Sequence, residues 1–181
     1  MVLAILGDPE TRAFLAEAEV NKRDVSTSLV EATVKLRPLP DHERLVSIRF
    51  DRLKDAGAAV RSVMASDLIP NVIELLDATA AAALSTTGAA LVVGFDGLRE
   101  QVDWQCSELE RLAGACGGRE AQSLPADAWP RLAPAARTAF PVAAAVMAFA
   151  VLPSQVAEVM EHGASAARAR GLNSAWAAHA G

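Results

Sequence analysis

The sequence predicts an α+β fold of the ferredoxin-like kind, in which an antiparallel sheet carries helices on one face. Segments with alternating apolar residues are separated by segments with apolar residues at three- and four-residue spacing, and this strand-helix-strand order repeats along the chain. Hydrophobic residues make up 52% of the 181 residues but aromatic residues only 4%. This composition favours many close helix contacts over an aromatic-rich all-β core. The length suits one domain, or one domain and a fragment.

The first unit begins with Val46, Ile48 and Phe50, which alternate with polar residues as in a half-buried strand. Asp51 is placed to cap a helix over about 52–66, whose apolar residues recur on one face. A strand over 72–76 and a short Ala-rich helix over 78–84 follow.

The second unit has a strand over 89–95 and the clearest amphipathic helix of the chain, over 97–116. Gly117-Gly118 supplies the left-handed geometry that ends a helix. The stretch 125–134, with a proline at each end, is expected to be irregular.

The last unit has a strand within 142–152, a helix that begins with Ser154 as N-cap and runs to about 170, and a strand over 174–178. At the other end, the pattern indicates a helix over about 8–20 and a strand over 28–36. Pro38-Leu39-Pro40 is the best boundary candidate. We therefore expect two parts, residues 1–40 and residues 41–181.

Charge and composition exclude several classes of protein. The formal net charge is −5, which disfavours nucleic acid as a partner because phosphate contacts need clustered cations. The longest apolar run, 141–152, is too short to span a bilayer, and no basic segment precedes the apolar residues 2–6 as in a secretory signal. Cys106 and Cys116 would lie about 15 Å apart along one helix, beyond disulfide reach. A cytoplasmic protein with reduced thiols is expected.

Several segments, in order, resemble one known family. Residues 29–40 (LVEATVKLRPLP) look like the last strand of the FAD-binding domain of FAD-linked oxidases. Residues 50–77, with FD, DAGAAV, IP and IELLD, are similar to the start of that family's C-terminal cap domain. LPSQV at 152–156 and AHAG at 178–181 match two later segments in the right order. The resemblance covers about residues 29–181, and the nearest relatives are flavoproteins of the glycolate oxidase and D-lactate dehydrogenase type.

The resemblance implies a function for the parent protein: oxidation of a 2-hydroxy acid by hydride transfer to FAD, with the cap domain on the substrate side. It also implies an FAD-domain or iron-sulfur subunit as partner and a cytoplasmic location, peripheral to the inner membrane through partner subunits. The Gly-rich segment that normally precedes the first matched strand is absent, since 21–27 read NKRDVST. We expect a fragment: residues 1–40 a remnant of the FAD-domain edge and linker, and 41–181 a cap domain truncated at its C-terminus. Such a chain alone would neither retain FAD nor turn over substrate.

The resemblance also suggests site residues. His179 lies on the AHAG motif and is the candidate catalytic residue. Arg131 and Arg137, in and just after the Pro-rich stretch, are candidates for binding the substrate carboxylate, because a guanidinium forms bidentate bonds to it. The family's flavin contacts carry over to Leu29, Val30 and Glu31. In metal-dependent relatives the histidine matching His179 joins a second histidine and a carboxylate; that second partner is absent here, and no metal site is expected.

Other candidates have plainer explanations. Glu74 and Asp77 would share one face of a helix and suggest an acid/base or metal pair, but a strand end and a helix cap explain them as well. His42 and His162 are expected to be solvated, in a linker and on a helix. The alternative to the whole functional reading is a non-enzymatic ferredoxin-like binding or dimerisation module, whose sheet face and Ala-rich helices pair with another chain.

Overall fold

The computed structural model describes residues 2–6, 40–125, 128–132, 135–140, 142 and 145–180. The strands are β1 (Val2–Leu6), β2 (His42–Phe50), β3 (Val72–Leu76), β4 (Ala89–Gly97), β5 (Arg119–Leu124), β6 (Ala145–Phe149) and β7 (Ser174–His179). The helices are α2 (Leu53–Met64), α3 (Ala78–Ala81), α4 (Arg99–Ala115), α5 (Trp129–Leu132), α6 (Ala135–Ala139) and α7 (Val156–Ala169), with 3-10 turns η2 (Ala82–Leu84) and η4 (Pro153–Gln155). The predicted helix 8–20 and strand 28–36 lie outside the described residues.

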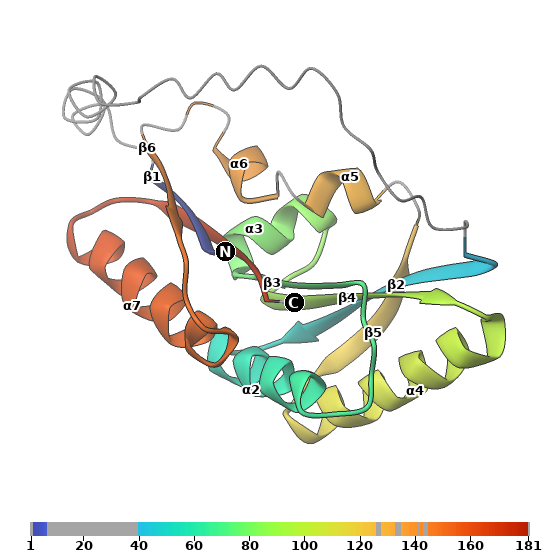
Figure 1. Cartoon of the computed structure of the whole chain (residues 1–181). Coiled ribbons are helices and arrows are strands. Elements are labelled where there is room, and N and C mark those ends of the chain that lie inside the picture. Colours follow the sequence, from blue (N-terminus) through green and yellow to red (C-terminus); the bar gives the residue numbers. More distant parts are fainter. Residues whose placement is uncertain are drawn as a thin grey trace, which may run out of the picture.

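The strands form one seven-stranded sheet in the order β5-β2-β4-β3-β7-β1-β6 (Figure 1), and every neighbouring pair is antiparallel. Its first four strands, with α2 and α4 as crossovers, have the split β-α-β arrangement of a ferredoxin-like fold, because β4 inserts between β2 and β3. The predicted α+β class is confirmed. Strands β7, β1 and β6 extend this sheet beyond β3.

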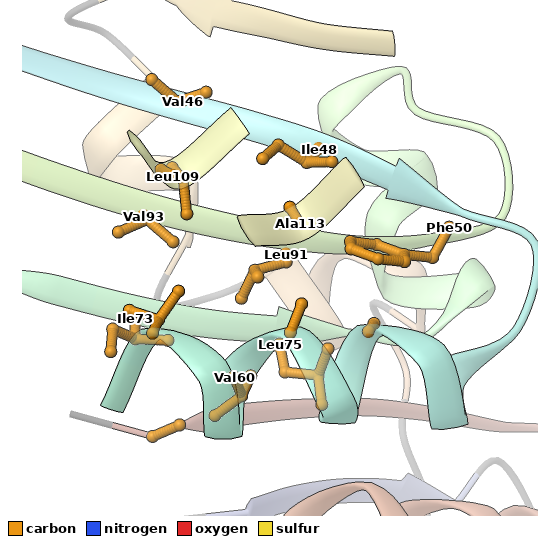
Figure 2. Close-up of a cluster of buried hydrophobic side chains, with 14 of the residues drawn as sticks. Val46, Ile48, Phe50, Val60, Ile73, Leu75, Leu91, Val93, Leu109 and Ala113 are labelled. Atoms are coloured by element: carbon orange, nitrogen blue, oxygen red, sulfur yellow. The ribbon is translucent and has the colours of Figure 1, made fainter. Parts of the chain in front are cut away.

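The three long helices α2, α4 and α7 lie together on one face of the sheet, as predicted (Figure 1). Figure 2 shows the core beneath them: alternate side chains of β2, β3 and β4 meet Val60 from α2 and Leu109 and Ala113 from α4. The alternation of Val46, Ile48 and Phe50 therefore corresponds to burial against helices, with exposures of 3%, 2% and 0%.

The opposite face is covered as well, by the short helices α3, α5 and α6 (Figure 1). This second core is rich in alanine, which allows short helices to approach the sheet closely. Its members include Leu76, Ala80, Ala90, Val92, Leu132, Ala136, Ala175 and Ala177. The expected irregular stretch 125–134 thus contains the helical turn α5 within its described part, and the sheet is a central layer.

The Gly-Gly stop of the long helix is confirmed. Gly117 has φ +90°, and the Gly118 amide donates to the carbonyl of Ala113 at 2.8 Å, which closes the end of α4. A left-handed φ without a Cβ penalty is the reason for glycine at position 117.

Two predicted N-caps are wrong. Arg52, not Asp51, is the N-cap of α2, and the Asp51 carboxylate instead accepts from Arg49 at 2.7 Å. Ser154 lies inside η4, and Gln155 is the N-cap of α7. In both cases the chain reaches the helix without a side-chain cap bond.

Two strands have no counterpart in the sequence analysis. β5 is an edge strand whose residues are nearly all exposed, so it lacks apolar alternation. Its pairing with β2 shifts register between Ser47 and Arg49, and there Glu120, at φ +53°, accepts from Arg49 at 3.0 and 3.2 Å. β1 joins the sheet between β6 and β7. β1 therefore belongs to the same sheet as the strands after residue 40. The division of the chain at residue 40 stays a prediction.

Candidate functional site

The central feature of the candidate site is a pair formed by Glu74 on β3 and His179 at the end of β7. The two residues are directly opposite in the antiparallel register. Backbone hydrogen bonds join Ala180 to Ile73 and Asp77 to Trp176. Glu74 and His179 therefore occupy a non-hydrogen-bonded position between these, where opposite side chains come closest.

The side chains of the pair are in contact. His179 Nδ1 lies 2.7 Å from Glu74 Oε1. The Glu74 side chain is 14% exposed and the His179 side chain 48% exposed. A largely buried carboxylate thus holds a half-exposed imidazole, and the candidate catalytic histidine has a defined orientation.

This pair lies on the face of the sheet that carries α3, α5 and α6. Along β7, Ala175 and Ala177 belong to the second core and Trp176 and Ala178 to the first. Because side chains alternate along a strand, His179 lies on the face of the second core. The same alternation along β3 assigns Glu74 to this face, between Val72 and Leu76.

The pair continues a row of residues in register across four strands. Glu74 is opposite Val92 on β4, and Val92 is opposite Ser47 on β2. Ser47 is 1% exposed, and its Oγ has no hydrogen-bond partner among the described residues. Strands lie about 4.8 Å apart, so the row from Ser47 to His179 spans about 14 Å. Three of its four residues are polar, with Val92 between Ser47 and Glu74, on a face that is otherwise lined with alanine, leucine and valine.

Glu74 and Asp77 do not form a carboxylate pair. Asp77 is the N-cap of α3, and its carboxylate accepts from the Ala80 amide at 2.8 Å. Burial raises the pKa of the Asp77 carboxyl, while hydrogen bonds from the amides of Ala80, Trp176 and Thr79 oppose the increase. The helix-cap explanation of Asp77 is therefore confirmed, whereas Glu74 lies in the middle of β3 and not at a strand end.

The two arginine candidates lie on helices of the same face. Arg131 is on α5 and Arg137 on α6, both with exposed side chains. Leu132 and Ala136, their neighbours in sequence, anchor these helices in the second core. Neither guanidinium forms an ion pair with the part of the chain that the structure describes. Their role in carboxylate binding stays a proposal.

The other candidates fall into two groups. Leu29, Val30 and Glu31 lie outside the described residues, and flavin contacts at these positions stay a prediction. His162 is exposed on α7, where Nδ1 lies 2.9 Å from the carbonyl of Glu158, as expected for a surface histidine.

The expectation for His42 is wrong. This residue begins β2, opposite Gly97, and is not in a linker. It lines a hollow of about 530 Å³ at the end of the sheet, with Arg44, Asn71 and Leu124. Its Nε2 is buried and has no hydrogen-bond partner among the described residues. The sequence offered no sign of this hollow, because it is formed by four strand ends that are distant in sequence.

Metal and membrane features are not apparent in the described ranges. No group of three or more histidine, cysteine, aspartate or glutamate side chains with metal-binding geometry occurs among these residues. Nor is any helix of this part both long enough and apolar enough to cross a membrane.

Sequence reasoning identified His179 but missed its partner. Glu74 and His179 are 105 residues apart, and only the strand order and register place them opposite each other. Ser47 looked like an outward-facing polar residue of a half-buried strand. The alternation of polar and apolar residues in β2 gave no sign that Ser47 is buried and not in solvent.

Comparisons with known proteins agree with this architecture. The model of the family described as FAD linked oxidases, C-terminal domain, matches residues 39–181. The glycolate oxidase subunit GlcD of Escherichia coli K12 is 31% identical over 104 residues, which are 51% of this chain and 21% of that protein. GlcD of E. coli O6:H1 matches with the same values. The chain thus spans about a fifth of the length of these curated relatives.

A solved structure described as alkyldihydroxyacetonephosphate synthase has the same fold, with a TM-score of 0.59 at 14% sequence identity. The alignment covers 79% of this chain and 38% of that one. These comparisons agree with the resemblance to FAD-linked oxidases that the sequence segments from residue 29 onward show. The chain belongs to the FAD-linked oxidases, and residues 39–181 are their C-terminal domain.

Proposed function

We propose that this chain is the substrate-side cap portion of an FAD-dependent oxidoreductase that oxidises a 2-hydroxy acid of the glycolate or D-lactate type. The family match and the similarity to a glycolate oxidase subunit support the reaction class. The observation that carries the proposal is the half-exposed imidazole of His179, held by the largely buried carboxylate of Glu74 on the sheet face.

Each proposed site residue has a chemical task. His179 hydrogen-bonds the hydroxyl of the substrate, and Arg131 and Arg137 bind its carboxylate. FAD, when bound, supplies the hydride acceptor. Its proposed contacts in this chain are Leu29 to Glu31. Three residues can cover only a small part of a flavin, so the rest of the flavin site is proposed to come from another part of the parent protein or from a partner. An FAD-domain or iron-sulfur subunit is the proposed partner, in the cytoplasm and peripheral to the inner membrane.

One observation favours the alternative, a ferredoxin-like binding or dimerisation module without catalysis. β6 is the last strand of the sheet, and large apolar side chains at and near it are exposed: Val142 by 75%, Val146 by 45%, Phe149 by 38% and Leu152 by 64%. An apolar sheet edge is a site for pairing with another chain.

Coexpression with the FAD-binding part of a glycolate-oxidase-like flavoprotein separates the two functions. The proposal expects a yellow complex whose flavin absorbance is bleached when glycolate or D-lactate is added without oxygen. His179→Ala should slow bleaching at least about 100-fold. His162→Ala, which alters an exposed histidine of α7, should leave it unchanged.

The contrary results are equally distinct. A complex that holds flavin but is not reduced by any 2-hydroxy acid would exclude the proposed reaction. A chain that forms a stable dimer and binds no FAD-domain partner would favour the alternative. The purified chain alone should bind no FAD in calorimetric titration.

A further inference from the structure

We infer that Glu74 is a positioning residue that fixes the tautomer of His179, so that the neutral ring carries its acceptor lone pair on Nε2. The inference rests on the proposed function for its purpose, which is to present an acceptor to a substrate hydroxyl. Its structural content, the tautomer of one imidazole, is independent of substrate and flavin.

The backbone brings the two side chains together before any side-chain interaction contributes. Glu74 and His179 are opposite residues at a non-hydrogen-bonded position of β3 and β7, flanked by the backbone bonds of Ala180 to Ile73 and Asp77 to Trp176. β3 continues on both sides of Glu74, while His179 is the last residue of β7 and is held there by the backbone bond from Ala180 to Ile73. The contact of 2.7 Å is therefore a consequence of register and not of two long side chains that meet in solvent.

The chemistry of the contact assigns the proton. An ionised carboxylate has no hydrogen to donate, so in this contact the hydrogen is on His179 Nδ1. A neutral imidazole has one N–H, and the other nitrogen, Nε2, is then the acceptor. The reverse assignment would place two lone pairs against each other at 2.7 Å.

The surroundings make the contact difficult to replace by water. Val92, opposite Glu74 on its other side, is 0% exposed, and the Glu74 side chain is only 14% exposed. In such apolar surroundings a hydrogen bond is stronger than in water. The largely buried Glu74 side chain therefore orients the half-exposed imidazole of His179, and Glu74 acts through that imidazole.

The tautomer is directly measurable by imidazole ¹⁵N NMR of the whole chain, at a pH where free histidine is neutral. His179 should show the Nδ1–H pattern. His162 is an internal reference for it, because its Nδ1 faces a backbone carbonyl, which only accepts. A His179 signal with the Nε2–H pattern in the unmodified chain would overturn the inference without any variant.

Glu74→Gln provides the second arm. Glutamine keeps the shape but can donate as well as accept, so this contact no longer favours the Nδ1–H tautomer. Since a bond to a charged group contributes about 1.5–3 kcal/mol, the Nδ1–H to Nε2–H ratio should fall at least about tenfold. Glu158→Gln is the matched control, because His162 uses the Glu158 carbonyl and not its carboxylate. An unchanged ratio in a folded Glu74→Gln chain would refute the inference.

The two proposals fail separately. If His179 has the expected tautomer but the coexpressed complex does not respond to 2-hydroxy acids, the proposed function is wrong and the assignment of Glu74 stands. If the complex is active but the tautomer of His179 is independent of Glu74, the assignment of Glu74 is wrong and the proposed function stands.

Discussion

Gly163 in α7 is expected to be one of the least replaceable positions of the chain. A Cβ built on this residue would overlap three ring atoms of Trp176, namely Cη2, Cζ2 and Cζ3. Trp176, on β7, is 3% exposed and belongs to the core under the long helices. The change to test is Gly163→Ala, which adds this one carbon and nothing else.

The ring of Trp176 cannot move aside without loss. Its Nε1 donates to Ser174 Oγ at 3.0 Å. Phe149 stacks on it with ring centroids 6.2 Å apart and an interplanar angle of 17°. The added methyl group therefore pushes either the ring out of these contacts or α7 away from the sheet.

The magnitude follows from two opposing terms. Alanine is favoured over glycine within a helix by about 1 kcal/mol. Overpacking of a tight core costs about 1–3 kcal/mol and occasionally more, and the restrained ring puts Gly163→Ala at or above the upper end. We expect a net loss of about 2 kcal/mol, which for a chain of this size lowers Tm by about 4–8 °C.

Gly114→Ala is the matched control, since Gly114 also lies inside a long helix, α4, and nothing is within 4 Å of its added Cβ. Gly114→Ala should gain only the free energy by which alanine is favoured over glycine in a helix, about 1 kcal/mol, and should raise Tm by about 2–4 °C. Thermal unfolding of both variants is followed by circular dichroism. Trp176→Phe combined with Gly163→Ala should cost less than the sum of the two single changes, because phenylalanine lacks the overlapping atoms. A Gly163→Ala chain at least as stable as Gly114→Ala would refute the reasoning.

Three further outcomes are expected. Val102→Asp, at a 0% exposed position of α4, should cost several kcal/mol by burying an unpaired charge, and an unchanged Tm would contradict this. Gly88→Ala should cost about 1–3 kcal/mol in urea unfolding, because φ is +83° and the new Cβ would meet the carbonyl oxygen of Phe50 at 2.7 Å; equal midpoints would argue against it. Burial raises the pKa of Asp77 above 3.8, so the folded chain keeps a proton that the unfolded chain releases, and stability should fall as pH rises from 3.8 to the folded pKa. Asp77→Asn keeps a cap and should abolish this fall; parallel urea curves for the two chains across that window would show that Asp77 contributes no such term.

Periodicity predicted the elements whose burial is one-sided. α2, α4 and α7 each bury one stripe of residues in the first core, so their patterns reflect that core directly. The expectation of a half-buried strand at β2 is wrong, because Leu45 and Ser47 are buried as well as Val46, Ile48 and Phe50. The ordered family segments predicted the domain type from the residues alone. The exposed edge strand β5 and the uniformly apolar β1 carry no periodic pattern, and only pairing with their neighbours makes them strands.

His179 was found as a candidate from a local motif, four residues long, and that required no fold. Its partner Glu74 required the order β3-β7 and a register in which a shift of one residue would place the carboxylate on the other face. Register is decided by the burial of whole strands, with Leu75 and Ala178 on one side of the sheet and Leu76 and Ala177 on the other. The motif was therefore local information, whereas the site depends on the sum of contacts along two strands 105 residues apart.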